Sequence, residues 1–477
     1  MEIHWIDLTV FIVYILLMLG VGAYFLKSNK STDDYYVGGR TMSSWHVGLS
    51  VVATDVGGGF SIGLGGLGFT MGISGSWMLF TGLLGAWLAA VILIPRITEI
   101  PGFKKLYTFP EIFKVFYDKK TALLAGIISA IGYAGFTSSQ LLAGAKLASS
   151  TFVSLSLQNA LFIMGTIAVV YTVMGGLKAV IYTDTIQWGL LLSGLIFIGI
   201  PLCYQAIGGY AGLTASIPDN FLSFSNLTWQ DLVNWGVTII PIWFVGMTLY
   251  QRIYACKSKR DAQKAWFIAG IFEWPIMAIM GVLLGMFARV AADQGMFEYA
   301  GFATAAGMDA EVGLPLLLRT VLPVGLTGLM MSAYFSAVLS TADSCLMASS
   351  GNLVTDIIGF EGTNTRKFLK LSQLFTLIIG VLALLLASFM QSVLELMLYS
   401  YAFMVSGLFI PVLGGLFLKK PDPNAAFFSM LIGGVTTISL IILNIQLPLG
   451  LDANIYGITM SLITFLSLNR ILTTHKA

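Results

Sequence analysis

The sequence predicts an all-α, polytopic membrane protein with about 13 transmembrane helices. Hydrophobic residues make up 57% of the 477 residues and charged residues only 10%, whereas a soluble domain carries roughly 25% charged residues. The mean hydropathy is +0.86. Apolar runs of about 20 residues, each long enough for a helix to cross the hydrocarbon of a bilayer, follow one another along the whole chain.

No soluble appendage, nucleotide-binding P-loop or low-complexity tail interrupts the apolar runs, so ATP-driven transport by this chain is not expected. The net charge of +2 gives no indication of nucleic acid. The first run lacks a basic segment before it, which favours a retained span over a cleaved signal. The runs lie near residues 6–26, 44–70, 73–95, 121–149, 158–174, 179–206, 232–254, 262–290, 323–356, 367–389, 394–418, 424–443 and 453–471.

Charges alternate between the two ends of these runs. If the N-terminus is outside, all of the 25 Lys and Arg residues except Lys146, Arg289 and Arg319 fall in inner segments, and the long outer segments hold acids such as Asp219 and Asp293 instead. Because short cytoplasmic loops are enriched in Lys and Arg, we expect an outside N-terminus and an inside C-terminus. We expect this multi-pass topology in a plasma membrane, specifically a bacterial inner membrane.

The stretch "ATDVGGGFSIG", residues 53–63, places a carboxylate and three glycines inside the second run. A broken helix at this depth is tolerated where the freed carbonyls line a cavity, and there they can coordinate a cation. Glycines alone more often serve close helix packing. Because Asp55 lies two positions before the glycine run, we favour an unwound binding helix.

The ninth run contains "SAVLSTADSCL", residues 336–346, in which Ala337, Ser340, Thr341 and Ser344 share one helical face. A carbonyl and two hydroxyls from one turn are the oxygen ligands that a hard cation prefers. Ser and Thr can equally bond back to their own helix or join two helices. The intramembrane Asp343 favours a functional site.

Two further acids lie within apolar runs. Asp184, in "GGLKAVIYTDTIQ", is equally compatible with a helix cap and with a second cation site, and Glu273 precedes Pro275, so a gating or structural role is as well supported as solute contact. Aromatic residues on these spans can wall a pocket or simply pack. They are Tyr133, Phe136, Trp243, Tyr250, Tyr399 and Tyr401.

With these motifs the chain resembles the sodium:solute symporter family, whose members include sodium/proline, sodium/glucose, sialic acid and choline transporters. The stretches "GGLKAVIYTDTIQ" and "AVLSTADSCLMASSGNLVTDI" are the most specific, and the resemblance covers nearly the whole chain. It implies the leucine-transporter fold, in which two inverted five-helix repeats follow one extra helix. The implied segments are 1–43 (extra helix and inner loop), 44–206 (first repeat), 207–231 (outer loop), 232–418 (second repeat) and 419–477 (two C-terminal helices).

The resemblance also implies sodium ligands. The main Na⁺ site would use backbone oxygens of Ala53, Val56 and Ala337 and the hydroxyls of Ser340 and Thr341. Members with a second sodium use an acid matching Asp184 and hydroxyls matching Ser340 and Ser344. Asp343 stands where some of those members carry a hydroxyl, so one and two sodium ions both remain open.

For the solute, Asp55 matches an acid of the proline branch and stands where the choline branch has an aromatic, whose loss removes one wall of a quaternary-ammonium cage. We therefore expect a small amino acid such as proline, with a sugar, carboxylate or other organic solute as alternatives. The candidate solute residues are Asp55, Gly57, Gly58, Phe60, Tyr133, Trp243 and Tyr250.

Two other classes of protein are less compatible with the sequence. A passive ion or solute channel would carry a repeated filter loop or rings of acids, and neither is visible. An enzyme is not expected, because the three histidines, His4, His46 and His475, lie near the chain ends or a membrane boundary, and no nucleophile–base spacing appears. We expect a monomer to suffice for transport.

Overall fold

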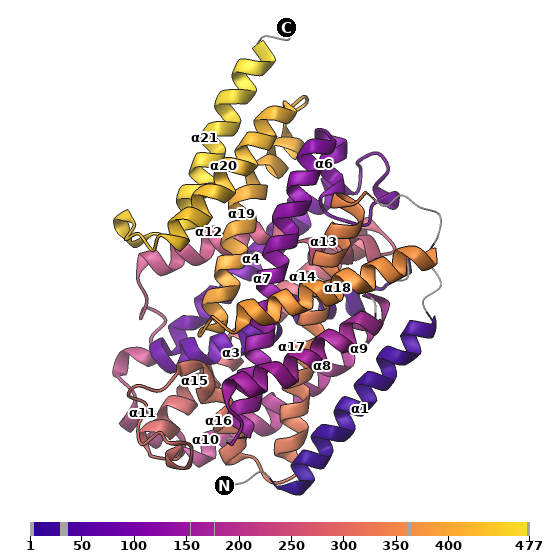
Figure 1. Cartoon of the computed structure of the whole chain (residues 1–477). Helices are drawn as coiled ribbons and strands as arrows, with labels where there is room; N and C mark the ends of the chain where they lie inside the picture. Colours follow the sequence, from indigo (N-terminus) through magenta and orange to yellow (C-terminus); the bar gives the residue numbers. More distant parts are fainter. Residues whose placement is uncertain (1–3, 29–36, 153, 176, 360–364, 475–477) are drawn as a thin grey trace.

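The computed structural model describes residues 4–28, 37–152, 154–175, 177–359 and 365–474. In these ranges the chain is helical without any strand, and one isolated bridge joins Met42 to Cys256. A helix or a pair of consecutive helices stands at the position of each of the 13 expected runs (Figure 1). These are α1 (Trp5–Ser28), α3 (Ser44–Met71), α4 with α5 (Trp77–Leu88, Ile94–Ile97), α7 (Lys119–Thr151), α8 (Leu157–Gly175), α9 with α10 (Leu177–Gly194, Ile200–Ala206), α12 with α13 (Trp229–Val245, Met247–Ala255), α14 with α15 (Lys259–Ile271, Ala278–Asp293), α17 (Leu326–Gly351), α18 (Thr365–Ala387), α19 (Val393–Phe417), α20 (Pro423–Ile442) and α21 (Ala453–Thr474).

The prediction of an all-α polytopic membrane protein is confirmed. By length and composition alone, the described part of the chain has eight helices able to cross a membrane, or nine if α12 and α13, bent by 43°, form one span. α17 is not among them because of its many Ser and Thr residues. It is nevertheless the most enclosed span, since every residue in it except Leu326 and Leu329 is buried. A polar helix is stable in a bilayer when protein surrounds it.

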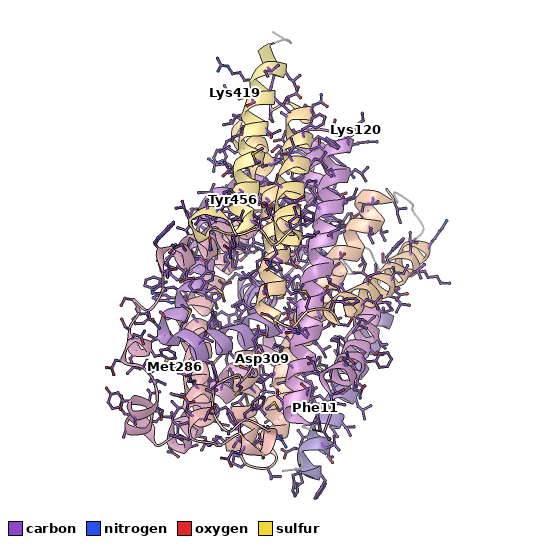
Figure 2. The ribbon with its side chains drawn as sticks, turned by 60° about the vertical axis from the view of Figure 1, so that its left-hand side comes forward. Phe11, Lys120, Met286, Asp309, Lys419 and Tyr456 are labelled. Carbon is purple, nitrogen blue, oxygen red and sulfur yellow. The ribbon has the colours of Figure 1, made fainter. Side chains whose placement is uncertain are left out.

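The chain begins and ends at opposite ends of the bundle, as an odd number of crossings requires. α1 starts at one end and α21 finishes at the other (Figure 1). Lys120 and Lys419 lie at the same end as the close of α21, while Asp309 and Phe11 lie toward the opposite end (Figure 2). This distribution agrees with the alternation of charge in the sequence. Short helices α6 (Glu111–Phe116), α11 (Gly209–Ser216) and α16 (Ala310–Val321) occupy the connections.

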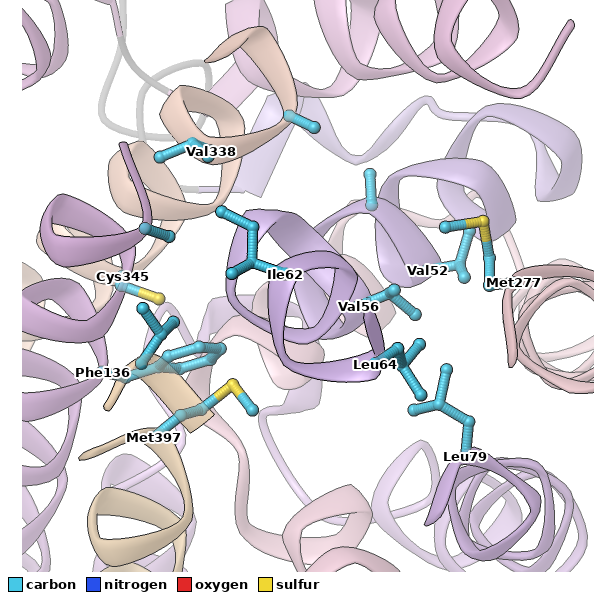
Figure 3. Close-up of a cluster of buried hydrophobic side chains, with 14 of the residues drawn as sticks. Val52, Val56, Ile62, Leu64, Leu79, Phe136, Met277, Val338, Cys345 and Met397 are labelled. Atoms are coloured by element: carbon cyan, nitrogen blue, oxygen red, sulfur yellow. The ribbon is translucent and has the colours of Figure 1, made fainter. Parts of the chain in front are cut away.

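α3 passes through the middle of the bundle. Figure 3 shows it between two groups of buried side chains: Val338 and Cys345 of α17, Phe136 of α7 and Met397 of α19 on one side, with Met277 and Leu79 on the other. The figure also shows the fully buried Val56 on the side of Met277. α3 therefore packs against elements on both sides of the bundle.

Three spans are broken within the bundle, one of them between α14 and α15, where Trp274 has a φ of −138° and a ψ of 125°. α3 is interrupted at Gly57, whose φ of 45° and ψ of −167° lie outside helical values. α12 and α13 meet at Gly246, which has an extended conformation (φ −70°, ψ 113°). The breaks at Gly57 and Gly246 lie in the first spans of the two repeats that the sequence predicts, 44–206 and 232–418.

The packing of α3 against α15 depends on glycine. A Cβ added at Gly285 would lie 2.1 Å from the carbonyl oxygen of Gly65, which is a backbone atom and cannot rotate away. We predict that Gly285→Ala forces the two helices apart and lowers the free energy of unfolding by about 1–3 kcal/mol, the usual cost of overpacking. Thermal unfolding of purified protein in detergent measures this loss.

Gly189→Ala is the matched control, because no atom lies within 4 Å of its added Cβ. Equal melting temperatures for the two variants would show that α3 and α15 do not need this close approach.

Candidate functional site

The break in α3 lies directly against α17. A Cβ at Gly57 would come 2.3 Å from the hydroxyl oxygen of Thr341. That hydroxyl is within hydrogen-bonding distance of two carbonyl oxygens, that of Ala53 at 3.0 Å and that of Ala337 at 3.2 Å. Three of the five expected sodium ligands therefore converge at one point. Val56 directly precedes the break, so its carbonyl group is at the end of the first helical half, next to Gly57.

The glycines after the break fit against two other helices. A Cβ at Gly58 would collide with Val338 of α17 at 2.1 Å, and one at Gly59 with Gln140 of α7 at 2.4 Å. The Gly59 N–H donates to Oε1 of Gln140 at 3.0 Å, and the Gly57 carbonyl accepts from the Ser61 hydroxyl at 2.7 Å. Both the packing and the binding interpretations of the glycine run thus have structural support.

Asp184 of α9 connects α3 with α17. Its two carboxylate oxygens accept hydrogen bonds from Ser340 and from Ser50, the latter at 2.5 Å. The side chain is fully buried. Asp184 and Ser340, which the sequence placed on separate motifs 156 positions apart, are thus direct neighbours.

Arg252 of α13 enters the same cluster, and the sequence analysis missed it by counting it with the inner-loop cations. The side chain is 0% exposed. Its guanidinium donates to Thr54 at 2.6 Å, Ser344 at 2.8 Å and Ser50 at 3.2 Å, and lies 3.7 Å from Asp184. The mixed polar and apolar stretch "TLYQRIYA" gave only a weak signal, because an Arg beside a span end normally reaches the interface.

Asp343 and Ser344 point to different partners. Ser344 lies 3.3 Å from Thr54 and accepts from Arg252. Asp343 instead accepts from Thr172 of α8. The structure therefore brings Ser344 into the cluster around Asp184, whereas the hydrogen bond of Asp343 leads to a different helix.

Asp55 lies with a second acid. The Tyr401 hydroxyl donates to Oδ1 of Asp55 at 3.3 Å, and the carboxyl group of Glu273 faces that of Asp55. Oδ2 of Asp55 and both oxygens of Glu273 are buried and have no hydrogen-bond partner among the described residues. Gly82 of α4 makes room for Glu273, because a Cβ there would lie 2.0 Å from its Oε2.

The aromatic candidates occupy different surroundings. Tyr133 shares a hydrogen bond of 3.0 Å with the Thr248 hydroxyl, just after the α12–α13 break. Trp243 packs edge-on against Trp266, and Tyr250 packs against Phe109 and donates to the Phe244 carbonyl at 3.0 Å. Tyr133 is thus beside the broken spans, while Trp243 and Tyr250 contact other aromatic rings. The side chain of Phe60 lies outside the described part of the structure.

Comparisons with known proteins identify the family. The model of the sodium:solute symporter family matches residues 35–433. The chain belongs to the sodium:solute symporter family. A sodium/glucose cotransporter of Vibrio parahaemolyticus is 28% identical, over 98% of this chain and 91% of the relative. A sodium/proline symporter of Escherichia coli is 26% identical, over 90% and 87%.

The fold is also that of solved symporters. A structure of a Na⁺-coupled sialic acid symporter in a substrate-bound, outward-open state matches with a TM-score of 0.78 and 22% identity over 98% of both chains. A nucleobase-cation-symport-1 family transporter matches with a TM-score of 0.61 and 14% identity over 94% of this chain and 96% of the other. The predicted leucine-transporter-type fold is confirmed, and this protein is a sodium-coupled solute symporter.

A cavity of about 480 Å³ begins beside the second half of α3, at Gly63 and Gly66, and is bounded by α16 and α19. Glu311 of α16 holds these elements together: it pairs with Lys146 of α7 at 2.7 Å and accepts from the backbone N–H of Val393 at 2.9 Å. Asp452 also lines this cavity. Burial raises the pKa of the Asp452 carboxyl group, and the negative charge of the nearby Asp231 raises it further.

We predict that sodium raises the melting temperature of the wild-type protein. Gly57→Ala should lower the melting temperature and remove this effect of sodium. The new Cβ would sit against Thr341 at a positive φ, a backbone strain that costs about 1–3 kcal/mol. The measurement is the melting temperature of the purified protein in NaCl and in KCl. Gly236→Ala, where the nearest atom lies 4.0 Å from the added Cβ, should keep the wild-type difference between the two salts. Full retention of that difference in Gly57→Ala would contradict the prediction.

Proposed function

We propose that the protein couples inward Na⁺ movement to the uptake of a small organic solute by alternating access, with the ion held at the break of α3. The observation that carries this proposal is the convergence of the Ala53 and Ala337 carbonyls on the Thr341 hydroxyl beside Gly57. Val56 and Ser340 would complete the ligand set. An all-oxygen set without a carboxylate suits a monovalent hard cation that must be released again in each cycle.

For the solute we propose an amino acid such as proline, with its cationic nitrogen held between Asp55 and Glu273. Two facing buried carboxyl groups without a hydrogen-bonded cation partner in the described structure favour a ligand that brings positive charge, because ionising both of them within the membrane without a cation costs about 3 kcal/mol for each charge. A neutral sugar would bring no cation to this pair, and at least one of the two carboxyl groups would then have to stay protonated. The family includes both proline and glucose transporters, so this pair of acids is the feature that favours the amino acid.

The backbone at Gly57 and Gly58 and the Tyr133 side chain would form the nearest walls of the solute site. In this proposal Trp243 and Tyr250 support the site from a second layer, because their rings pack against Trp266 and Phe109. The half-helix that follows Gly57 would direct its N-terminal end, which favours negative charge, toward the carboxylate of the solute.

We also propose the membrane arrangement. The repeats would span 44–206 and 232–418, supported by the broken first span in each. The end of the bundle that carries α16 would face outward and the end that carries Lys120 and Lys419 would face the cytoplasm, as the enrichment of cations there favours. A single chain contains the broken first span of each repeat, so a monomer would suffice.

Replacing Ser340 and Thr341 together with Ala should abolish sodium-stimulated uptake in proteoliposomes, because the ion loses two hydroxyl ligands. Each single variant should weaken the apparent sodium affinity by about tenfold or more, which corresponds to roughly 1.4 kcal/mol or more. Ser332→Ala is the control, since that hydroxyl bonds only to the Gly328 carbonyl of its own helix in the described structure, at 2.7 Å. An unchanged sodium affinity in the double variant would refute this ion site.

Glu273→Gln and Asp55→Asn should each raise the KM for an amino acid by roughly tenfold to hundredfold, the value of a charge-assisted hydrogen bond. Uptake of a panel of labelled amino acids, sugars, carboxylates and choline, with and without an inward sodium gradient, first identifies the solute. The exposed Glu298 provides the control Glu298→Gln. If a neutral sugar is the accumulated solute, the role given to the two acids is wrong.

A further inference from the structure

Arg252 is a permanent cation at the centre of the membrane bundle. It lies on α13, the helical half that follows the break at Gly246, and every residue of this half is buried in the bundle. The guanidinium contacts four elements: Ser50 and Thr54 of α3, Asp184 of α9, Thr248 of its own helix and Ser344 of α17. An arginine guanidinium keeps its charge in proteins.

The partners of Arg252 include the residues expected to hold a second sodium ion. Ser344 is 2.8 Å from the guanidinium nitrogen, and the nearer carboxylate oxygen of Asp184 is 3.7 Å from it. The remaining acid of that expected set, Asp343, accepts from Thr172 instead. A sodium ion bound to Ser344 and Asp184 would therefore stand against a guanidinium of the same charge, in a place that the side chain already fills.

We propose that Arg252 acts as a tethered cation in place of a second sodium ion, so that the protein binds one sodium ion. This inference rests on the proposed sodium site at Ala53, Ala337 and Thr341 and concerns the neighbouring cluster around Asp184, to which the Ser340 hydroxyl is bonded. A covalently attached cation satisfies Asp184 in every state of the cycle and is never released. The transport cycle then takes its driving force from a single ion.

The geometry also explains why the residue is arginine. Its fork of N–H donors serves hydroxyl, carbonyl and carboxylate oxygens in different directions at once, whereas a lysine ammonium would act as a single point charge. A neutral side chain at this position would leave Asp184 with hydroxyl donors and no cation among the contacts that the structure shows. The vacated position would then offer a sodium ion the oxygens of Ser50, Thr54, Asp184 and Ser344.

The first test is to count sodium ions on the wild-type protein. Equilibrium binding of ²²Na⁺ to the full-length chain in detergent, without solute, should saturate at one ion per chain with a Hill coefficient near 1. Two ions per chain would overturn the proposal. If no ion binds, the sodium site of the proposed function fails, which is a distinct result and leaves no site for Arg252 to complement.

The second test removes the tethered cation. Arg252→Gln should raise the saturation value to two ions per chain, and Arg252→Gln combined with Ser344→Ala should weaken or abolish the second ion. Arg289→Gln is the matched control, because Arg289 is partly exposed and pairs with Asp293 outside this cluster. A properly folded Arg252→Gln protein that still binds one ion would overturn the proposal, and the wild-type count decides it if that variant does not fold.

Discussion

The structure depends on one constraint: a helix broken inside a bilayer must find partners for its backbone within the protein. Around the break in α3 those partners are side chains. Ser61 donates to the Gly57 carbonyl, Gln140 accepts from the Gly59 N–H and Thr341 donates to the carbonyl of Ala53. Because Gln140 belongs to α7 and Thr341 to α17, the break requires three spans to meet at the same depth. The candidate ion ligands are the carbonyls at this meeting point.

The buried acids on the two sides of that meeting point differ in whether a cation lies beside them. Asp184 is compensated, since it has two hydroxyl donors and a nearby guanidinium. Asp55 and Glu273 face each other with no such cation among their described contacts. Removing the guanidinium would leave Asp184 as a buried acid without a cation, whereas the two facing carboxyl groups can both ionise at low cost only when a cation binds. The first arrangement suits a permanent structural role and the second suits a ligand that binds and leaves.

The broken spans α3 and α12–α13 also link the site to the rest of the bundle. Tyr133 of α7 bonds to both the hydroxyl and the backbone N–H of Thr248, at the start of α13, and α13 carries Arg252 into contact with α3. At the other end Glu311 binds Lys146 and the first backbone groups of α19. Glu311 and residues of α16 and α19 line the cavity beside α3, so movement of α16 relative to α19 would change access to it.

The sequence by itself determined the class of the protein. Apolar runs of the right length predicted the spans, because a bilayer permits little else than continuous helices. Asp55 and the glycines predicted the break, and Ala337, Ser340 and Thr341 predicted a ligand face, because helical periodicity places them on one side. These signals are local, and each depends on the physics of a single helix in lipid.

Only the tertiary structure decided which groups face each other. Asp184 and Ser340 are 156 positions apart, and no spacing rule shows that they share a hydrogen bond. Arg252 resembled an ordinary cation at the end of a span, yet the bend at Gly246 turns its helix into the bundle. Trp243 was indistinguishable in sequence from a pocket wall, although it packs on Trp266. Long-range pairing depends on how helices are oriented around one another, and that orientation is fixed by packing across the whole bundle rather than by any one segment.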